Sequence, residues 1–171
     1  MPMPSPAERF AAAKVAVVDD EHFMRKVLRA LLTSIGVTEV YEAADGEAGL
    51  DLIRLKAPDV VLLDWKMPGL DGPGFVRMVR SPETFPYPNV PIIMLSGHGD
   101  RSHVVEAVQI GVNEFLLKPV STKALQERLL AVLSKPRPLM KDGNYYGPMP
   151  RKMAAINADG DAAIANLTLL N

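Results

Sequence analysis

The sequence predicts an α/β protein with a parallel sheet between two layers of helices. Between about residues 14 and 134, short apolar runs alternate with amphipathic stretches, which is the pattern of strands followed by helices in such a sheet. Most of these runs are continuous Val, Ile and Leu, as expected for strands covered on both faces. Five strands and five helices in strict alternation imply right-handed crossovers and a three-layer sandwich.

The apolar runs define the expected strands, which lie at residues 14–18, 39–42, 59–63, 91–95 and 114–117. Parallel strands end at one edge of a sheet, so the residues that follow these runs are expected to lie together. The proline-rich segment 81–91 precedes the fourth strand. We therefore expect that segment at the amino ends of the strands, away from any site built at the carboxyl ends.

Helical periodicity fills the intervals between the strands. In residues 22–35 the apolar side chains recur on one stripe, and Gly36 follows where a left-handed helix end favours glycine. Asp45 and Ser121 are good N-caps for the second and fifth helices. The third helix opens with Gly72-Pro73, because proline is tolerated in a first turn. The fourth covers about residues 100–110.

The composition is that of an ordinary globular protein. The chain has 171 residues, of which 48% are hydrophobic and 23% charged, and a net charge of -1. It has no Cys, no long apolar run and no signal-peptide pattern, so disulfides, thiolate zinc sites and membrane spans are not expected. Prolines mark the boundaries of an N-terminal arm at 1–13, a domain at 14–134 and an extension at 135–171. We expect a cytoplasmic protein.

Polar residues follow four of the apolar runs. Asp19-Asp20-Glu21 follows the first run, Asp64 the third, Ser96 the fourth and Lys118 the fifth. Carboxylates brought together repel one another and require a cation or protons. Magnesium fits, since it prefers oxygen ligands from one or two carboxylates together with phosphate and water. One carboxylate is then suited to attack phosphorus, with the hydroxyl and the ammonium on the phosphoryl oxygens. The pattern indicates phosphoryl transfer onto an aspartate.

These motifs resemble the CheY-like receiver domain of two-component response regulators. The matching segments are VAVVDDE (15–21), VVLLDWKMPGLDG (60–72), IIMLSG (92–97) and EFLLKP (114–119), and the resemblance covers about 120 residues. It implies a flavodoxin-like (βα)5 fold with strand order 2-1-3-4-5. It also implies two-component signal transduction by a phosphoprotein rather than an enzyme, with magnesium as cofactor.

The resemblance assigns a role to each site residue. Asp64 becomes the phosphoacceptor and Asp20 a direct magnesium ligand, whereas Asp19 acts on the metal through water. The backbone carbonyl of Lys66 completes the protein ligands of the metal. Ser96 becomes the switch hydroxyl, and Lys118 becomes the phosphate-binding cation before a proline that is often cis.

Three further roles follow from the resemblance. Phe115 falls at the switch aromatic, which turns inward when the hydroxyl moves toward the phosphoryl group. Phenylalanine lacks the phenol that is common there, so only its packing can switch. Lys66 and His98 flank the path of attacking water and are candidates for tuning the lifetime of the acyl phosphate; surface positions without kinetic effect are the alternative. His98 and His103 have poor spacing for a metal pair. We expect Trp65 and Met67 to pack at or line the rim of the site.

The C-terminal extension is too short and irregular for a DNA-binding effector, and it has no basic patch. Its segment Tyr145-Tyr146-Gly147-Pro148 can dock on the domain, on a second copy to give a homodimer, or on a partner. Residues 161–170 are compatible with a short helix. We expect neither nucleic acid nor membrane as a partner.

The function expected from these observations is that of a single-domain response regulator. It takes phosphate onto Asp64 from the phosphohistidine of a sensor histidine kinase or histidine phosphotransfer protein, and it then presents a switched surface to a downstream protein target. The alternative is a phosphorelay carrier that passes the group on to a histidine phosphotransfer protein. A phosphatase of the haloacid dehalogenase type is disfavoured, since Asp19-Asp20-Glu21 lacks the required DxD spacing.

Overall fold

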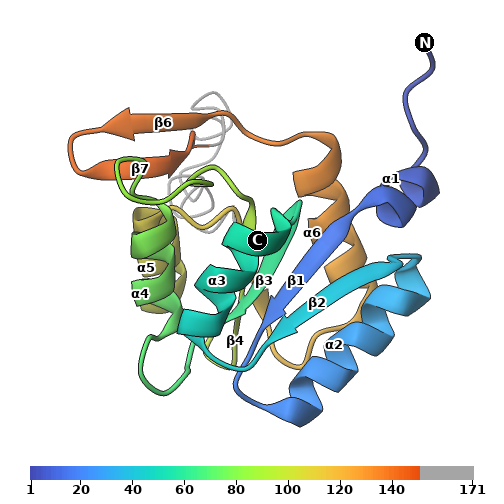
Figure 1. Cartoon of the computed structure of the whole chain (residues 1–171), viewed down its shortest axis with the longest axis horizontal. Coiled ribbons are helices and arrows are strands. Elements are labelled where there is room, and N and C mark those ends of the chain that lie inside the picture. Colours follow the sequence, from blue (N-terminus) through green and yellow to red (C-terminus); the bar gives the residue numbers. More distant parts are fainter. Residues whose placement is uncertain (151–171) are drawn as a thin grey trace.

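A central parallel sheet organises the fold, as the computed structural model shows for the described residues 1–150 (Figure 1). Its strand order is β2-β1-β3-β4-β5, so the predicted order 2-1-3-4-5 is confirmed. Every neighbouring pair in this sheet runs parallel. The strands are β1 (Lys14–Val18), β2 (Glu39–Ala43), β3 (Val60–Asp64), β4 (Ile92–Ser96) and β5 (Glu114–Leu117).

Helices cover both faces of the sheet and make the predicted three-layer sandwich. One layer holds α2 (His22–Ile35) and α6 (Thr122–Ser134), whose buried leucines pack on the side chains of Val15 and Val17. The other layer holds α3 (Gly46–Lys56), α4 (Gly72–Val79) and α5 (Arg101–Ile110), which pack on Ala16 and Val18. Successive β1 residues therefore alternate between the two cores, as the pleat requires.

Three strands end one residue later than the sequence predicts: β2 at Ala43, and β3 and β4 each at a polar residue. The expected strands at 59–63 and 91–95 are Val60–Asp64 and Ile92–Ser96 in the structure. Asp64 pairs with Leu95, and Ser96 pairs with Leu117, so both polar residues continue the ladder of the sheet. The phosphoacceptor candidate and the switch hydroxyl are thus fixed by strand pairing rather than carried on loops. The caps Asp45 and Ser121 are confirmed, and their side chains accept from the backbone N–H groups of Ala48 and Ala124.

The region expected to be an N-terminal arm contains a helix, α1 (Pro6–Ala12), which the periodicity did not predict. Ser5 and Glu8 form a reciprocal capping box at its start. Phe10 is buried in the α2/α6 layer, and the Arg9 guanidinium donates to the carbonyl of Leu133. The helix therefore extends the core at the amino end of the sheet.

The C-terminal extension forms a β-hairpin of β6 (Leu139–Asp142) and β7 (Tyr145–Pro148), which was also not predicted. Of the three docking modes considered for Tyr145–Pro148, the structure shows docking on the domain. The carbonyl of Asn113 accepts from Arg137, and the Tyr146 hydroxyl donates to Asn89 at 2.5 Å. The helix considered for residues 161–170 lies outside the described residues.

Arg80 joins the hairpin side of the domain to the proline-rich segment. Its buried guanidinium donates to the carbonyls of Gly111 and Val90 and to the side-chain oxygen of Asn113, at 2.7 to 2.9 Å. It also donates to the carbonyl of Pro88 at 2.6 Å. These partners all lie at the amino end of the sheet, so the position expected for segment 81–91 is confirmed. Within residues 1–150, no helix is long and apolar enough to cross a membrane.

Candidate functional site

Three carboxylates meet at the carboxyl end of the sheet. Asp19 and Asp20 follow β1, Asp64 ends β3, and one oxygen from each of the three lies within 4.8 Å of the others. Asp19 and Asp64 are buried, whereas Asp20 is exposed. The convergence predicted from the ends of the apolar runs is therefore present in the structure.

Lys118 provides the cation beside these acids. Its ammonium lies 2.8 Å from Oδ1 of Asp64 and 3.5 Å from Oδ2 of Asp19. The Lys118-Pro119 peptide is cis, as the resemblance implies. This ammonium contacts two of the three clustered carboxylates, so its single charge does not balance the acids, and the cluster stays suited to a further cation.

Burial and pairing act in opposite directions on these groups. Desolvation is the largest influence on Asp19 and Asp64, and it raises the pKa of both carboxyls although Lys118 lowers it. The pKa of Lys118 is also raised. Burial alone would lower it, but the hydrogen bonds to and charges of Asp64 and Asp19 together outweigh burial. The ionised acids are thus costly for the fold, and the ammonium is stabilised by them.

The donor set fits magnesium. Three carboxylate oxygens within 4.8 Å of one another offer the hard ligands that this ion prefers. Exposed Asp20 and an open cavity of about 690 Å³ leave room for water and phosphate oxygens at the same place. Lys66 is exposed and lines this cavity beside Asp64.

Ser96 lies at the same edge, at the end of the neighbouring strand. Its hydroxyl oxygen accepts from the backbone N–H of His98 at 3.0 Å, and the hydroxyl is 3.2 Å from the His98 carbonyl. Both Ser96 and His98 line the cavity with Asp64. The hydroxyl therefore orders the loop after β4 while standing at the edge of the site.

Aromatic rings surround the rim. Trp65 and Met67 are buried and line the cavity, as predicted. Phe115 is only 3% exposed and meets Trp65 edge-on with 6.4 Å between ring centroids. The inward position of Phe115 therefore coexists with a Ser96 hydroxyl bonded to His98. His98 and His103 stack at 5.3 Å between centroids, and the His103 ring lies 4.8 Å from that of Trp65.

Sequence reasoning missed Arg25, a residue of α2 that contacts the main chain of the acidic segment after β1. Its guanidinium donates to the backbone carbonyl of Asp19 at 2.8 Å and lies 3.3 Å from a carboxylate oxygen of Glu42. No sequence signal distinguishes it, since α2 carries several basic residues on its polar face. Asp71, which lines the cavity, was also not singled out, and its side chain caps α4.

Comparison with known proteins agrees with this geometry. The family model described as response regulator receiver domain matches residues 15–130. The chemotaxis protein CheY of Pseudomonas aeruginosa is 32% identical over 122 residues, covering 71% of this chain and 97% of that protein. A probable transcriptional regulator, ycf27 of Guillardia theta, is 41% identical over 122 residues, covering 71% of this chain but only 46% of the regulator. The chain thus matches about half of that longer relative.

Solved structures give the same result. The chemotaxis protein CheY4 of Vibrio cholerae matches with a TM-score of 0.64 and 33% identity, covering 71% of this chain and 98% of that one. A CheX-CheY-BeF3-Mg complex from Borrelia burgdorferi matches with a TM-score of 0.65 and 29% identity, covering 72% of this chain and 90% of that one. Proteins of this kind are signalling phosphoacceptors that bind Mg²⁺ at an acidic pocket. With its fold, acidic cluster and lysine in place, this chain belongs to the response regulator receiver domain family.

Proposed function

We propose that this protein accepts a phosphoryl group on Asp64 from a phosphohistidine donor. The observation that carries the proposal is the position of Asp64, a buried carboxylate within 2.8 Å of Lys118 and in the three-carboxylate cluster. A carboxylate oxygen attacks phosphorus, a new O–P bond forms, and the P–N bond to the donor imidazole breaks. The imidazole leaves with the electron pair of that bond and takes up a proton.

The remaining residues bind and orient the group. Lys118 is suited to pair with a phosphoryl oxygen, because its ammonium already contacts the accepting carboxylate. Ser96 supplies a hydroxyl to another phosphoryl oxygen after leaving its bonds to His98. Asp20, Asp64 and the carbonyl of Lys66 would hold Mg²⁺ directly and Asp19 through water. When bound, the ion offsets the charge of the carboxylates and of the transferring group.

Residues at the rim are proposed to set the lifetime of the acyl phosphate. Lys66 and His98 are both exposed and line the cavity, Lys66 from the segment after β3 and His98 from the segment after β4. Water that hydrolyses the acyl phosphate approaches through this cavity. Replacement of either side chain by Ala is expected to change the autodephosphorylation rate, and an unchanged rate in both variants would remove this role.

Phosphorylation is proposed to change the surface of α5, β5 and α6. Ser96 pairs with Leu117 at the end of β5, and Leu117 is 52% exposed, so a movement of Ser96 reaches this surface directly. Phe115 lies on the same strand and packs on Trp65, beside the acceptor. The downstream partner is a protein that binds this surface; the phosphodonor is a sensor histidine kinase or a histidine phosphotransfer protein. The division into residues 1–13, 14–134 and 135–171, a cytoplasmic location and a homodimer stay predictions.

Acetyl phosphate and intact mass spectrometry test the proposal. Wild-type protein is expected to gain one acid-stable, base-labile phosphoryl group in the presence of Mg²⁺ and none in excess EDTA. Asp64→Asn removes the acceptor and abolishes labelling. Asp71→Asn is the matched control, because Asp71 lines the same cavity but caps α4. Labelling of Asp64→Asn at the wild-type rate would contradict the proposal.

A second experiment separates the switch from the phosphorelay carrier. Purified phosphorylated protein is mixed with a histidine phosphotransfer domain from the same host. Rapid return of the phosphoryl group to the histidine supports the carrier, whereas phosphorylation-dependent binding of a target protein supports the switch.

A further inference from the structure

Arg25 contacts the acidic loop from the side opposite Lys118. One Nη atom of its guanidinium donates to the Asp19 carbonyl at 2.8 Å, and Nε lies 3.3 Å from Oε1 of Glu42. The Arg25 side chain is only 14% exposed. Arg29, one turn along α2, contacts the other carboxylate oxygen of Glu42 at 2.8 Å, but its side chain is 47% exposed. Glu42 thus pairs with two arginines. Arg25 also donates to the carbonyl of Asp19 in the acidic loop, whereas Arg29 donates to the carbonyl of Val40 in β2.

The polar atoms of Asp19 are all partnered. Its N–H donates to the carbonyl of Ala43 at 3.1 Å, and Oδ1 accepts from the N–H of Glu21 at 2.9 Å. Oδ2 faces Lys118, and the carbonyl oxygen accepts from Arg25. The carbonyl of Asp19 and the N–H of Asp20 belong to one planar peptide. A bond that fixes this carbonyl therefore also fixes the direction in which the Asp20 backbone leaves β1.

We propose that Arg25, held by Glu42, is a positioning residue for the magnesium site. It acts through the Asp19–Asp20 peptide and sets where the exposed carboxylate of Asp20 stands relative to Asp64. The inference rests on the proposed function, because it concerns the affinity of the same site for Mg²⁺. Partners that orient metal ligands affect affinity strongly even though they do not touch the ion.

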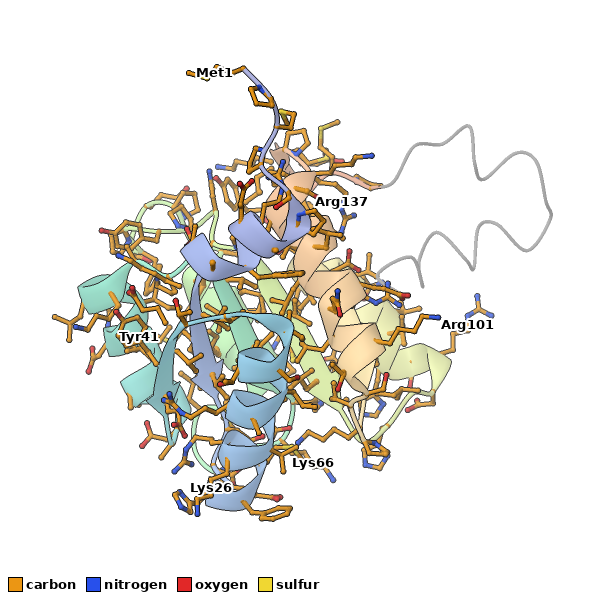
Figure 2. All side chains as sticks on the ribbon, turned by 90° about the vertical axis from the view of Figure 1, so that its right-hand side faces the viewer. Met1, Lys26, Tyr41, Lys66, Arg101 and Arg137 are labelled. Atoms are coloured by element: carbon orange, nitrogen blue, oxygen red, sulfur yellow. The ribbon has the colours of Figure 1, made fainter. Side chains whose placement is uncertain are left out.

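The charge of Arg25 and its hydrogen bond predict opposite effects on affinity. A cation near the acids repels Mg²⁺, so removal of the charge alone would tighten binding. Removal of the hydrogen bond frees the Asp19–Asp20 peptide to rotate, so the ligands must be ordered when the ion binds. The sign of the change in affinity therefore distinguishes a positioning residue from a nearby charge. Figure 2 shows Lys26, the next residue of α2, at the same end of the molecule as Lys66, and Glu21, the N-cap of α2, lines the cavity together with Lys66.

Arg25→Met and Arg29→Met are the matched variants. Both remove an arginine that pairs with Glu42, but only the first removes the bond to Asp19. Trp65 reports on the site, because it is the single Trp of the chain and lines the cavity beside Asp64. Titration with Mg²⁺ alone, followed by Trp65 fluorescence, gives the dissociation constant of each full-length variant. Urea unfolding in Mg²⁺-free buffer checks that both variants are folded.

We expect Arg25→Met to weaken Mg²⁺ binding by about tenfold and Arg29→Met by less than about twofold. The half-saturating Mg²⁺ concentration for labelling by acetyl phosphate should rise by the same factor in Arg25→Met, with a smaller change in the rate at saturating Mg²⁺. Arg25→Lys keeps the charge without the planar fork and should fall between wild type and Arg25→Met. Unchanged or tighter binding by Arg25→Met would overturn the inference. Absence of Mg²⁺ binding by wild type would instead overturn the proposed function.

Discussion

Buried charge is handled differently at the two ends of the sheet. At the amino end, the Arg80 guanidinium donates to three carbonyls and one amide oxygen, all within 2.9 Å. At the carboxyl end, Asp19 and Asp64 are equally buried, but Lys118 is the ammonium that both share. Figure 2 shows Met1 and Arg137 at one end of the molecule and Lys66 at the other. Both ends bury charged groups, but at the amino end four oxygens surround one guanidinium, whereas at the carboxyl end one ammonium contacts two buried carboxylates.

Arg80 serves the fold, whereas the acids are available for chemistry. The hydrogen bonds of the Arg80 guanidinium to three carbonyls and one amide oxygen stabilise the local fold. Burial lowers the pKa of Arg80 to about 10, so the group stays charged at neutral pH. At the carboxyl end, three carboxylates cluster beside one ammonium and line an open cavity, so their negative charge is only partly neutralised. The two ends should therefore respond in opposite ways to removal of the buried charge.

The largest effect on stability is expected at Arg80. Arg80→Met removes the side-chain donor from the carbonyls of Gly111, Val90 and Pro88, whereas the Asn113 side-chain oxygen keeps its bond from the Ile92 N–H. Because each orphaned buried acceptor costs about 1 to 3 kcal/mol, we expect unfolding free energy to fall by about 3 kcal/mol or more, as measured by urea denaturation. Arg77→Met is the control, since Arg77 lies in α4, the helix that Arg80 follows as C-cap, and its side chain is 59% exposed. This variant should change stability by less than about 0.5 kcal/mol. Similar losses in both variants would contradict the comparison.

A smaller loss is expected where the hairpin packs on the domain. A Cβ added at Gly147 would lie 2.6 Å from the Tyr145 hydroxyl oxygen and 2.7 Å from the Gly111 Cα. Gly147→Ala should therefore destabilise the docked hairpin by about 2 kcal/mol and speed amide hydrogen exchange in residues 145–147. The control is Gly143→Asn, because Gly143 has φ +58° with open space around it, and Asn tolerates that conformation. Exchange that is equally slow in both variants would show that Gly147 does not limit docking.

The smallest change, a gain in stability, is expected at the carboxyl end. The folded-state pKa of Asp64 is raised above its unfolded value of 3.8, chiefly by burial, so the folded state binds this proton more tightly. Protonated Asp64 therefore contributes to the free energy of unfolding. This contribution is fully present below pH 3.8 and is lost as the pH rises through the folded-state pKa. Asp64→Asn should then be more stable than wild type by about 1 kcal/mol at pH 7 in Mg²⁺-free buffer, a modest figure because solvent screens the open site.

The pH dependence of the stability gain shows whether the charge of Asp64 causes it. Urea unfolding from pH 3 to pH 7 should show the stability difference between Asp64→Asn and wild type growing with pH over the window above 3.8. Addition of Mg²⁺ should reduce the difference, since it stabilises the wild type by binding the folded state. A difference that is constant with pH would mean that the charge of Asp64 does not cause it.

Much of the fold and of the site was predictable because each strand of the central sheet is a recognisable apolar run in the sequence. Strands covered on both faces read as unbroken apolar runs, and Asp19, Asp64, Ser96 and Lys118 stand at their carboxyl ends. The order of the strands came from family resemblance rather than from the runs. The exact ends of β3 and β4 were missed, since Asp64 and Ser96 are polar residues that still pair in the ladder.

The terminal elements were missed although signals for both exist. Ser5 and Glu8 have capping-box spacing and Pro6 opens the helix, but prolines at the start suggested only a boundary. Gly143-Asn144 is a two-residue turn with glycine first, between Lys141-Asp142 and Tyr145-Tyr146, and glycine at the first turn position is the signature of a type II′ hairpin. Arg80 had no such signal, because its partners come from two separate segments, 88–90 and 111–113, and meet only in the folded chain.

The central claim, that Asp64 is the residue that accepts phosphorus, is tested most directly at the level of one residue. Protein phosphorylated by acetyl phosphate is reduced with borohydride, which cleaves an acyl phosphate and converts the aspartate to homoserine, and peptide mass spectrometry then locates the change. We predict conversion at position 64 alone, and only in samples that contained Mg²⁺. Conversion at position 19 or 20 with none at 64, or none anywhere in the presence of Mg²⁺, would contradict the account.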